Sequence, residues 1–384
     1  MARILVSVCM VRYPLGGMIC NSLQWLYGLH RLGHECYILE KANYPNACFN
    51  PLAGTMDDNG AYGLAVVSAL LARIGLENRL CFVDYHDNYH GLAQAEVDAL
   101  FRKADLYIDY GNHGAWLQEA SSTQCRIFVD GEPGYRQIQL VNEEAASGRN
   151  PLLGYHYYYT VGQNIGTAKS CAPTGGFQWR HVFHPICIDL FKVVPASAGA
   201  PFTTVMNWQS HTPIPYKGAI YGQKDLEFEK FLSLPRLTSA VLEVAVGGHQ
   251  VPTERLLAAG WRLRSAHDVT ISYDSFLHYI CKSQGEFSVC KNVFVATNSG
   301  WFSDRSAAYL ASGRPVVLQE TGFSGHLPCG RGLFAVKDAA QAAEAIRSIE
   351  KDYQKHSQWA REIANEHFDS AKVWGRVLSE VGMH

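Results

Sequence analysis

The stretch "RILVSVCMVRYPLGGMICNSLQWLYGLHRLGHECYILE" (residues 3–40) decides the fold class. Residues 3–10 form a near-continuous apolar run, as expected of a strand that is buried on both faces. Apolar side chains then recur at helical spacing until Gly33, which is a typical C-terminal cap, and residues 36–40 form a second apolar strand. Because the crossover between two such strands is right-handed, the unit predicts a parallel sheet.

The same alternation continues on both sides of a linker. Residues 61–76 predict a helix, and 80–85, 104–111 and 125–134 predict strands. Small residues and prolines end the segment 184–201, the best linker candidate in the chain. A second alternating pattern follows, with strands predicted at 202–208, 240–248, 291–297, 314–320 and 330–336.

The length of 384 residues favours two domains. We therefore predict an α/β protein built from two Rossmann-like domains. The N-terminal domain is predicted over residues 1–195 and the C-terminal domain over 196–384, with the last helix able to pack back on the N-terminal domain. Ligands of open α/β sheets bind beyond the carboxyl ends of the strands.

Composition narrows the class of protein. The formal net charge is −2, from which we predict no nucleic-acid partner. No run of about 18 apolar residues occurs, so no transmembrane helix is expected. The 11 cysteines are scattered without a C-x-x-C motif, which favours a reducing, cytoplasmic location. We expect a monomer or homodimer.

The segment "NSGWFSDRSAAYLASGRPVVLQETGF" (residues 298–323) carries the strongest functional signal. A polar glycine loop leads into a helix that Ser303 can cap. Asp304 can accept hydrogen bonds from ribose hydroxyls, and Arg305 can pair with a phosphate. Glu320 and Gly322 follow the next strand. If the residues have no ligand, Ser303 and Asp304 are helix caps and Arg305 is a surface charge.

This segment resembles the donor-nucleotide segment of GT-B-type glycosyltransferases, in which a glycine loop, a helix and small-x-G-x-P-V-V follow one another. "YPLGGMICNSLQWLYGLHRLGHECYILE" (residues 13–40) is similar to the glycine-pair unit of the same enzymes. The resemblance implies transfer of a sugar from a nucleoside diphosphate sugar, of UDP, dTDP or GDP type, to a soluble small molecule or natural product. It implies no other cofactor and no metal ion.

The sequence departs from that family in two places. Ala308 stands where the retaining branch usually has a glutamate, which leaves Asp304 as the nearest carboxylate. The strand at 202–208 is not followed by the arginine that grips the diphosphate, and the nearest cations are Lys217 and Lys224. Lys224, just before a helix, fits best.

The resemblance implies the GT-B architecture, in which the two Rossmann-like domains face each other across a cleft. It assigns the acceptor to the N-terminal domain and the nucleotide sugar to the C-terminal domain, with Gly16 and Gly17 at the interface. The predicted donor-binding residues are Gly16, Gly17, Lys224, Ser299, Gly300, Ser303, Asp304, Arg305, Glu320 and Gly322. A glycine pair lets the backbone approach a ligand closely. A tight turn that is needed only for packing would show the same glycine pair in the sequence.

Candidate catalytic residues lie at strand ends of the N-terminal domain. Glycosyl transfer by inversion needs a base, which is typically histidine, aspartate or glutamate. His113, Asp130 and Glu132 are the candidates, and the two acids could instead bond only their local turn. The segment 82–90 holds two histidines and two aspartates, but its glycine and asparagine favour a loop, so we predict no metal site there.

Three other functions remain open. A nucleotide-sugar epimerase of the same fold would need no acceptor. An NAD-dependent oxidoreductase would use Glu40 on the ribose, although the third glycine of that fingerprint is missing. A non-catalytic sugar-binding protein would bind nucleotide sugar without turnover.

Overall fold

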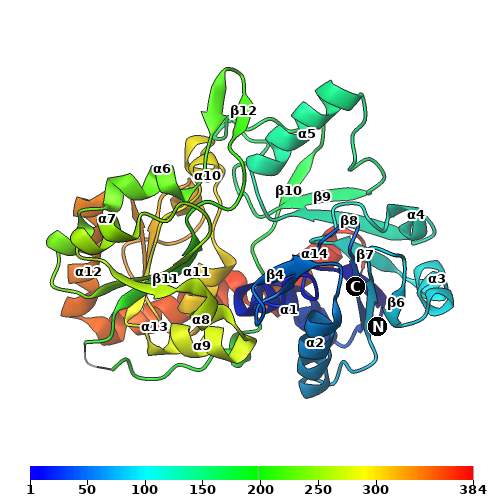
Figure 1. Ribbon diagram of the computed structural model, residues 1–384, viewed down its shortest axis with the longest axis horizontal. Helices are drawn as coiled ribbons and strands as arrows, with labels where there is room; N and C mark the ends of the chain where they lie inside the picture. Colours follow the sequence, from blue (N-terminus) through cyan, green and yellow to red (C-terminus); the bar gives the residue numbers. More distant parts are fainter. Residues whose placement is uncertain (198, 384) are drawn as a thin grey trace.

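The computed structural model describes residues 1–197 and 199–383, and its two main sheets lie in separate halves of the molecule (Figure 1). The first sheet has eight strands in the order β10-β9-β8-β7-β1-β2-β5-β6, which are all parallel to their neighbours except β6. The strands are β1 (Arg3–Ser7), β2 (Glu35–Lys41), β5 (Leu80–Val83), β6 (Tyr89–Gly91), β7 (Leu106–Asp109), β8 (Cys125–Asp130), β9 (Tyr157–Thr160) and β10 (Trp179–His181).

The second sheet has six parallel strands in the order β15-β14-β11-β16-β17-β18. They are β11 (Phe202–Asn207), β14 (Leu242–Gly247), β15 (Arg262–Ser265), β16 (Gly285–Ser288), β17 (Val316–Gln319) and β18 (Leu333–Val336). Two small antiparallel hairpins are separate from the sheets: β3 (Cys48–Asn50) with β4 (Thr55–Asp57), and β12 (Ile214–Tyr216) with β13 (Ala219–Tyr221).

Helices connect the strands of both sheets (Figure 1). The first half contains α1 (Gly16–Arg31), α2 (Ala61–Arg73), α3 (Gln94–Lys103), α4 (Leu117–Ala120) and α5 (Tyr135–Ser147). The second contains α6 (Lys224–Phe228), α7 (Thr253–Ala258), α8 (Ala266–Thr270), α9 (Tyr273–Lys282), α10 (Asn292–Ala296), α11 (Asp304–Ala311), α12 (Ala339–Lys351), α13 (Tyr353–Ile363) and α14 (Ser370–Glu380).

The predicted α/β alternation is confirmed, with one error in the second half. Residues 291–297 were predicted as a strand, but α10 occupies most of that range, and the strand is β16 at 285–288. The sequence of β16, "GEFS", contains a glycine, a carboxylate and a hydroxyl. It is nevertheless completely buried, because Glu286 pairs with Arg305 inside the fold.

The final helix lies against the first half of the chain. Trp374 of α14 meets Trp25 of α1 edge to face, with ring centroids 5.5 Å apart. Glu380 of α14 accepts a hydrogen bond from the Tyr159 hydroxyl at 2.7 Å. The domain boundary at 195/196 stays a prediction. Within the described residues, no helix combines the length and apolar character needed to cross a bilayer.

Candidate active site

A buried carboxylate shapes the loop that follows β1. Glu40 at the end of β2 is fully buried, and its Oε2 accepts hydrogen bonds from the backbone amides of Met10 and Val11, both at 2.7 Å. Its Oε1 accepts from the amide and the guanidinium of Arg12 at 2.9 and 3.0 Å. These four hydrogen bonds occupy both carboxylate oxygens of Glu40. The oxidoreductase alternative needed this carboxylate to bind the ribose of NAD, and protein donors already use it.

Gly16 brings the two halves of the molecule into contact. A Cβ at this position would overlap the carbonyl oxygen of Ser272 and lie 2.7 Å from Cβ of Phe276 in α9. A Cβ on Gly17 would lie 3.7 Å from the Phe276 ring, which is an ordinary contact. Close packing of α1 against α9 therefore explains Gly16. The donor-binding role of both glycines stays a prediction.

His113 lies in a loop that Asp109 organises at the end of β7. The buried Asp109 carboxylate accepts hydrogen bonds from the amides of residues 111–114 and from the Tyr155 hydroxyl. His113 adopts a left-handed backbone with φ of 46° and keeps access to solvent. The protein atoms around its ring reduce its hydration without excluding solvent, and this partial desolvation and the charge of Arg136 lower its pKa to about 4. The ring is therefore neutral near pH 7.

The two acids after β8 have different environments. Asp130 is buried and accepts from Gln137 Nε2 and Thr160 Oγ1, both at 2.8 Å, and from the amide of Glu132 at 2.9 Å. Burial raises the pKa of Asp130. Its bonds hold the loop that carries Glu132, whose two oxygens lie 2.7 and 2.6 Å from Nζ of Lys291. That ion pair joins the first half of the chain to the second.

Arg305 is held inside the second sheet. Its Nε and Nη2 donate to Glu286 Oε1 and Ser288 Oγ, both at 2.6 Å, and its Nη1 donates to the Val205 carbonyl oxygen at 2.8 Å. All three nitrogens are engaged, so the guanidinium has little capacity left for the phosphate predicted to bind it. Its charge still contributes to the electrostatics of this end of the sheet.

Lys224 is a buried cation without a counter-ion. It is only 7% exposed, and no carboxylate of the described residues pairs with it. Burial, together with the nearby charges of Arg305 and Lys291, lowers its pKa to about 7. We call Lys224, Lys291 and Arg305 the cation cluster. Glu286 and Glu132 pair with Arg305 and Lys291, so Lys224 is the member of the cluster whose charge favours an anionic ligand there.

The loops that carry Ser299, Gly300 and Gly322 pack against the first half of the chain. The amides of Gln163 and Asn164 donate to the carbonyl oxygens of Gly300 and Ser299, at 3.3 and 3.0 Å. Gly300 has φ of 72° and Gly322 has φ of 97°, and a Cβ on either would collide with residue 164. Close packing between the halves thus explains both glycines.

The predicted donor-binding residues Glu320, Ser303 and Asp304 have different hydrogen-bonding environments. Glu320 accepts a hydrogen bond from the amide of Gly322 at 2.5 Å and so closes a local turn. Ser303 precedes α11 in an extended conformation, but its side chain makes no capping bond. Asp304 is partly exposed, and no described residue donates a hydrogen bond to its carboxylate.

Asp304 lies close to groups of the first half of the chain. Its charge acts on the pKa values of Cys20, Tyr110 and His184. His184 is 3% exposed, and neither of its ring nitrogens has a hydrogen-bond partner. Asn21 donates to the Tyr110 hydroxyl at 2.7 Å. The start of α11 and the first turns of α1 therefore meet at one polar junction.

Sequence reasoning missed several of these groups. Lys291 and Arg136 follow no recognised motif, and their importance depends on which partners they have or lack. Only their positions next to strand ends could have indicated them. Lys291 comes shortly after the short strand β16, and Arg136 lies in the first turn of the helix that follows β8. Since β16 was not predicted as a strand, Lys291 was not recognised as lying at a strand end.

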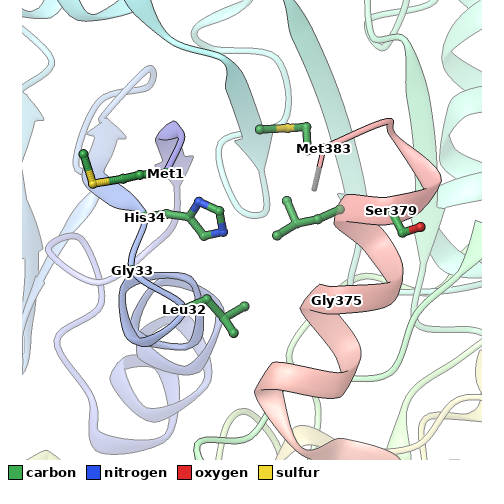
Figure 2. A pocket seen from close by; sticks show the side chains of 8 residues that line it. Met1, Leu32, Gly33, His34, Gly375, Ser379 and Met383 are labelled. Atoms are coloured by element: carbon green, nitrogen blue, oxygen red, sulfur yellow. The ribbon is translucent and has the colours of Figure 1, made fainter.

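A surface recess of about 370 Å³ lies away from this junction, between the end of α1 and α14 (Figure 2). In Figure 2 Met1, Leu32 and His34 lie on one side and Gly375, Ser379 and Met383 on the other. The cation cluster contributes no residue to it. Nowhere in residues 1–197 and 199–383 do three or more histidine, cysteine or acidic residues gather as metal ligands would.

No protein-family model and no curated protein matches the chain. Solved structures with a similar fold do match it. Anabaena Alr3699/HepE in complex with UDP and glucose has a TM-score of 0.58 over 99% of both chains, at 13% identity. An alpha-glucosyltransferase in complex with UDP and a 13-mer DNA containing a HMU base has a TM-score of 0.59 over 99% of both chains, at 11% identity. The alpha-glucosyltransferase bound to UDP-glucose and DNA with an abasic site has a TM-score of 0.57 over 99% of both, at 12% identity.

The prediction of no nucleic-acid partner is contradicted by these comparisons, because proteins of this architecture are bound to DNA. Net charge is an average over the whole chain, and an average near zero is compatible with local cationic surfaces. The exclusion drawn from the net charge of −2 was therefore wrong.

At identities of 11–14%, the likeness to these structures establishes the fold. It extends over nearly the full length of both chains, so it includes both sheets and the final helices. The chain has the GT-B fold of UDP-bound glycosyltransferases.

Proposed function

We propose that this protein transfers a sugar from a nucleoside diphosphate sugar to a soluble acceptor. The observation that carries the proposal is Lys224, a buried ammonium that no carboxylate of the described residues pairs with, near the ion-paired cations Arg305 and Lys291. Burying an unpaired charge is costly, so such a group is expected where a ligand supplies the opposite charge. A diphosphate carries at least two negative charges, which would compensate the charge of Lys224.

UDP is the nucleotide of choice for the proposal. The structural neighbours HepE and alpha-glucosyltransferase were solved with UDP or UDP-glucose. The carboxylate of Asp304 has free acceptor capacity at the start of α11 and would bind the ribose hydroxyls. Lys224 would contact the diphosphate, with Lys291 helping once Glu132 releases it.

The chemical step follows from these charges. The acceptor hydroxyl forms a bond to the anomeric carbon, and the bond from that carbon to the diphosphate oxygen breaks. Protonated Lys224 stabilises the negative charge that develops on the leaving diphosphate. His113, neutral near pH 7, would take the proton from the acceptor hydroxyl. Asp130 would act by holding the loop after β8 in place.

The test is a thermal-shift screen against UDP, dTDP, GDP and ADP, followed by incubation of UDP-glucose with candidate acceptors. Ligand binding to the folded state raises the melting temperature by mass action. We expect UDP to give the largest shift. Isomerisation of the nucleotide sugar without an acceptor would instead favour an epimerase, and binding without turnover on any acceptor would favour a sugar-binding protein.

A further inference from the structure

A second buried cation lacks a partner, and it lies in the first half of the chain. Arg136, in the first turn of α5, is 8% exposed. Its Nη1 donates to Gln139 Oε1 at 2.8 Å, while its buried Nε has no hydrogen-bond partner. Among the residues that the structure describes, no carboxylate lies within ion-pair distance of this guanidinium.

The neighbouring carboxylates are all committed to other groups. Asp109 binds loop amides and the Tyr155 hydroxyl, and Asp130 binds Gln137 and Thr160. Both oxygens of Glu132 are bound by Lys291. None of these three acids forms an ion pair with Arg136, so within the described residues its guanidinium has no carboxylate partner.

Arg136 lies at the strand edge that carries His113. Strands β8, β7 and β1 are adjacent in the sheet, and Arg136, His113 and Arg12 follow their carboxyl ends in that order. Arg12 differs from Arg136 because Glu40 neutralises it at 3.0 Å. The charges of Arg136 and Arg12 both lower the pKa of His113, which is consistent with their closeness.

We propose that the acceptor carries a phosphate group, which Arg136 binds beside His113. This inference rests on the proposed function, in which the first half of the chain presents the acceptor. The planar guanidinium matches phosphate geometry and can donate two parallel hydrogen bonds to it. One arginine without a carboxylate partner suits a single phosphate group on the acceptor.

The experiment titrates methyl phosphate into protein saturated with UDP, by calorimetry at pH 7.5 and constant ionic strength. UDP fills the proposed donor site, so the methyl phosphate can report only on a second anion site. We expect the wild-type protein to bind it and Arg136→Gln to bind it at least about tenfold more weakly, as loss of a charge-assisted hydrogen bond implies. Arg136→Lys keeps the positive charge but lacks the planar guanidinium with its two parallel donors. Its affinity for methyl phosphate should therefore lie between those of the wild type and Arg136→Gln.

Arg180→Gln is the matched control, because Arg180 lies on the same sheet but pairs with Glu380. It should bind methyl phosphate as the wild type does. Binding that is undetectable in the wild type, or equal in the wild type and Arg136→Gln, would overturn the proposal. So would tighter, Arg136-dependent binding of an oligonucleotide than of methyl phosphate.

The design separates this proposal from the proposed function. UDP affinity is measured first and alone, and its absence counts against the donor site only. Methyl phosphate titrated without UDP then still tests Arg136. If Arg136→Gln does not fold, Arg136→Lys and the wild-type protein decide the outcome by the same comparison.

Discussion

Glu132 and Lys291 join the two halves of the molecule through a two-oxygen ion pair, with Nζ 2.7 and 2.6 Å from the carboxylate oxygens. Glu132 follows β8 of the first sheet, and Lys291 belongs to the cation cluster of the second. In the proposed enzyme a carboxylate of the protein therefore occupies one of the cations that the donor diphosphate would use. The pair and the donor compete for Lys291.

Replacement of Glu132 by glutamine should release Lys291. We expect UDP to bind Glu132→Gln several-fold more tightly, with a stronger dependence on salt, because one more free ammonium faces the diphosphate. The free energy of unfolding should change by less than about 1 kcal/mol, since the Glu132 side chain is 42% exposed. Glu119→Gln, which breaks the Lys41–Glu119 pair of the first half, is the control. UDP affinity that is unchanged or weaker would contradict the competition.

Lys224→Met should stabilise the protein while removing UDP binding. The buried, unpaired ammonium opposes folding, and a methionine of similar length does not. The folded-state pKa of Lys224 is about 7, below the unfolded value near 10.4, so the destabilisation is complete below pH 7 and disappears as pH rises toward 10.4. Denaturant unfolding at pH 6 should show a gain of roughly 1–4 kcal/mol, smaller at pH 9. The exposed Lys217→Met should change neither property, and a less stable Lys224→Met would refute this account.

UDP binding should take up a proton above pH 7. The free protein holds Lys224 about half protonated near pH 7, and the diphosphate favours its charged form, so binding raises the pKa. The affinity for UDP should then fall as pH rises past 7, where the phosphate itself is already ionised. Calorimetry in two buffers of different ionisation enthalpy measures the uptake directly. An affinity that is independent of pH from 7 to 9 would exclude Lys224 as the contact.

Asp304→Ala should weaken UDP binding at least severalfold and leave stability nearly unchanged, because no described residue donates a hydrogen bond to its carboxylate. Asp338→Ala provides the contrast. Asp338 caps α12 by accepting from the amide of Gln341 at 2.9 Å, so its loss should cost about 1 kcal/mol of stability without affecting UDP. A stability loss in Asp304→Ala with normal UDP affinity would make Asp304 a helix cap only.

His113→Asn should lower the turnover number by about 10²- to 10⁴-fold once an acceptor is known, as expected for removal of a general base. Asparagine tolerates the left-handed backbone at this position, where φ is 46°, better than alanine does. Because the pKa of His113 is about 4, the acid limb of the wild-type turnover profile should appear as pH drops toward 4. A turnover number that survives in His113→Asn would transfer the role of base to another residue.

The sequence was sufficient for the fold because residues 3–40 alternate between fully apolar strands and a periodic helix. The strand β16 was misplaced because a buried ion pair with Arg305 of α11 lets the charged Glu286 occupy a central strand. The glycine pair was also ambiguous in principle. A backbone that approaches a ligand and a helix that approaches another helix both demand glycine, and Gly16 meets Ser272 and Phe276.

The candidate site was harder to predict, because it is defined by buried charged groups that have no partner of opposite charge in the part of the chain that the structure describes. Arg305 looked available from its motif, yet three protein acceptors engage it. Arg136 looked ordinary, and the sequence offered Lys224 only as a cation near the expected diphosphate; within the described residues, each is buried without a carboxylate partner. Such pairing depends on residues far apart in the sequence, which no local pattern records.

Calorimetric titration of the wild-type protein and Lys224→Met with UDP at pH 7 tests the central claim most directly. The proposed donor site predicts that UDP binds the wild-type protein, that uridine binds far more weakly, and that Lys224→Met loses UDP binding while remaining folded. Equal affinity of the wild-type protein and Lys224→Met for UDP, or no binding of any nucleoside diphosphate by the wild-type protein, would contradict it.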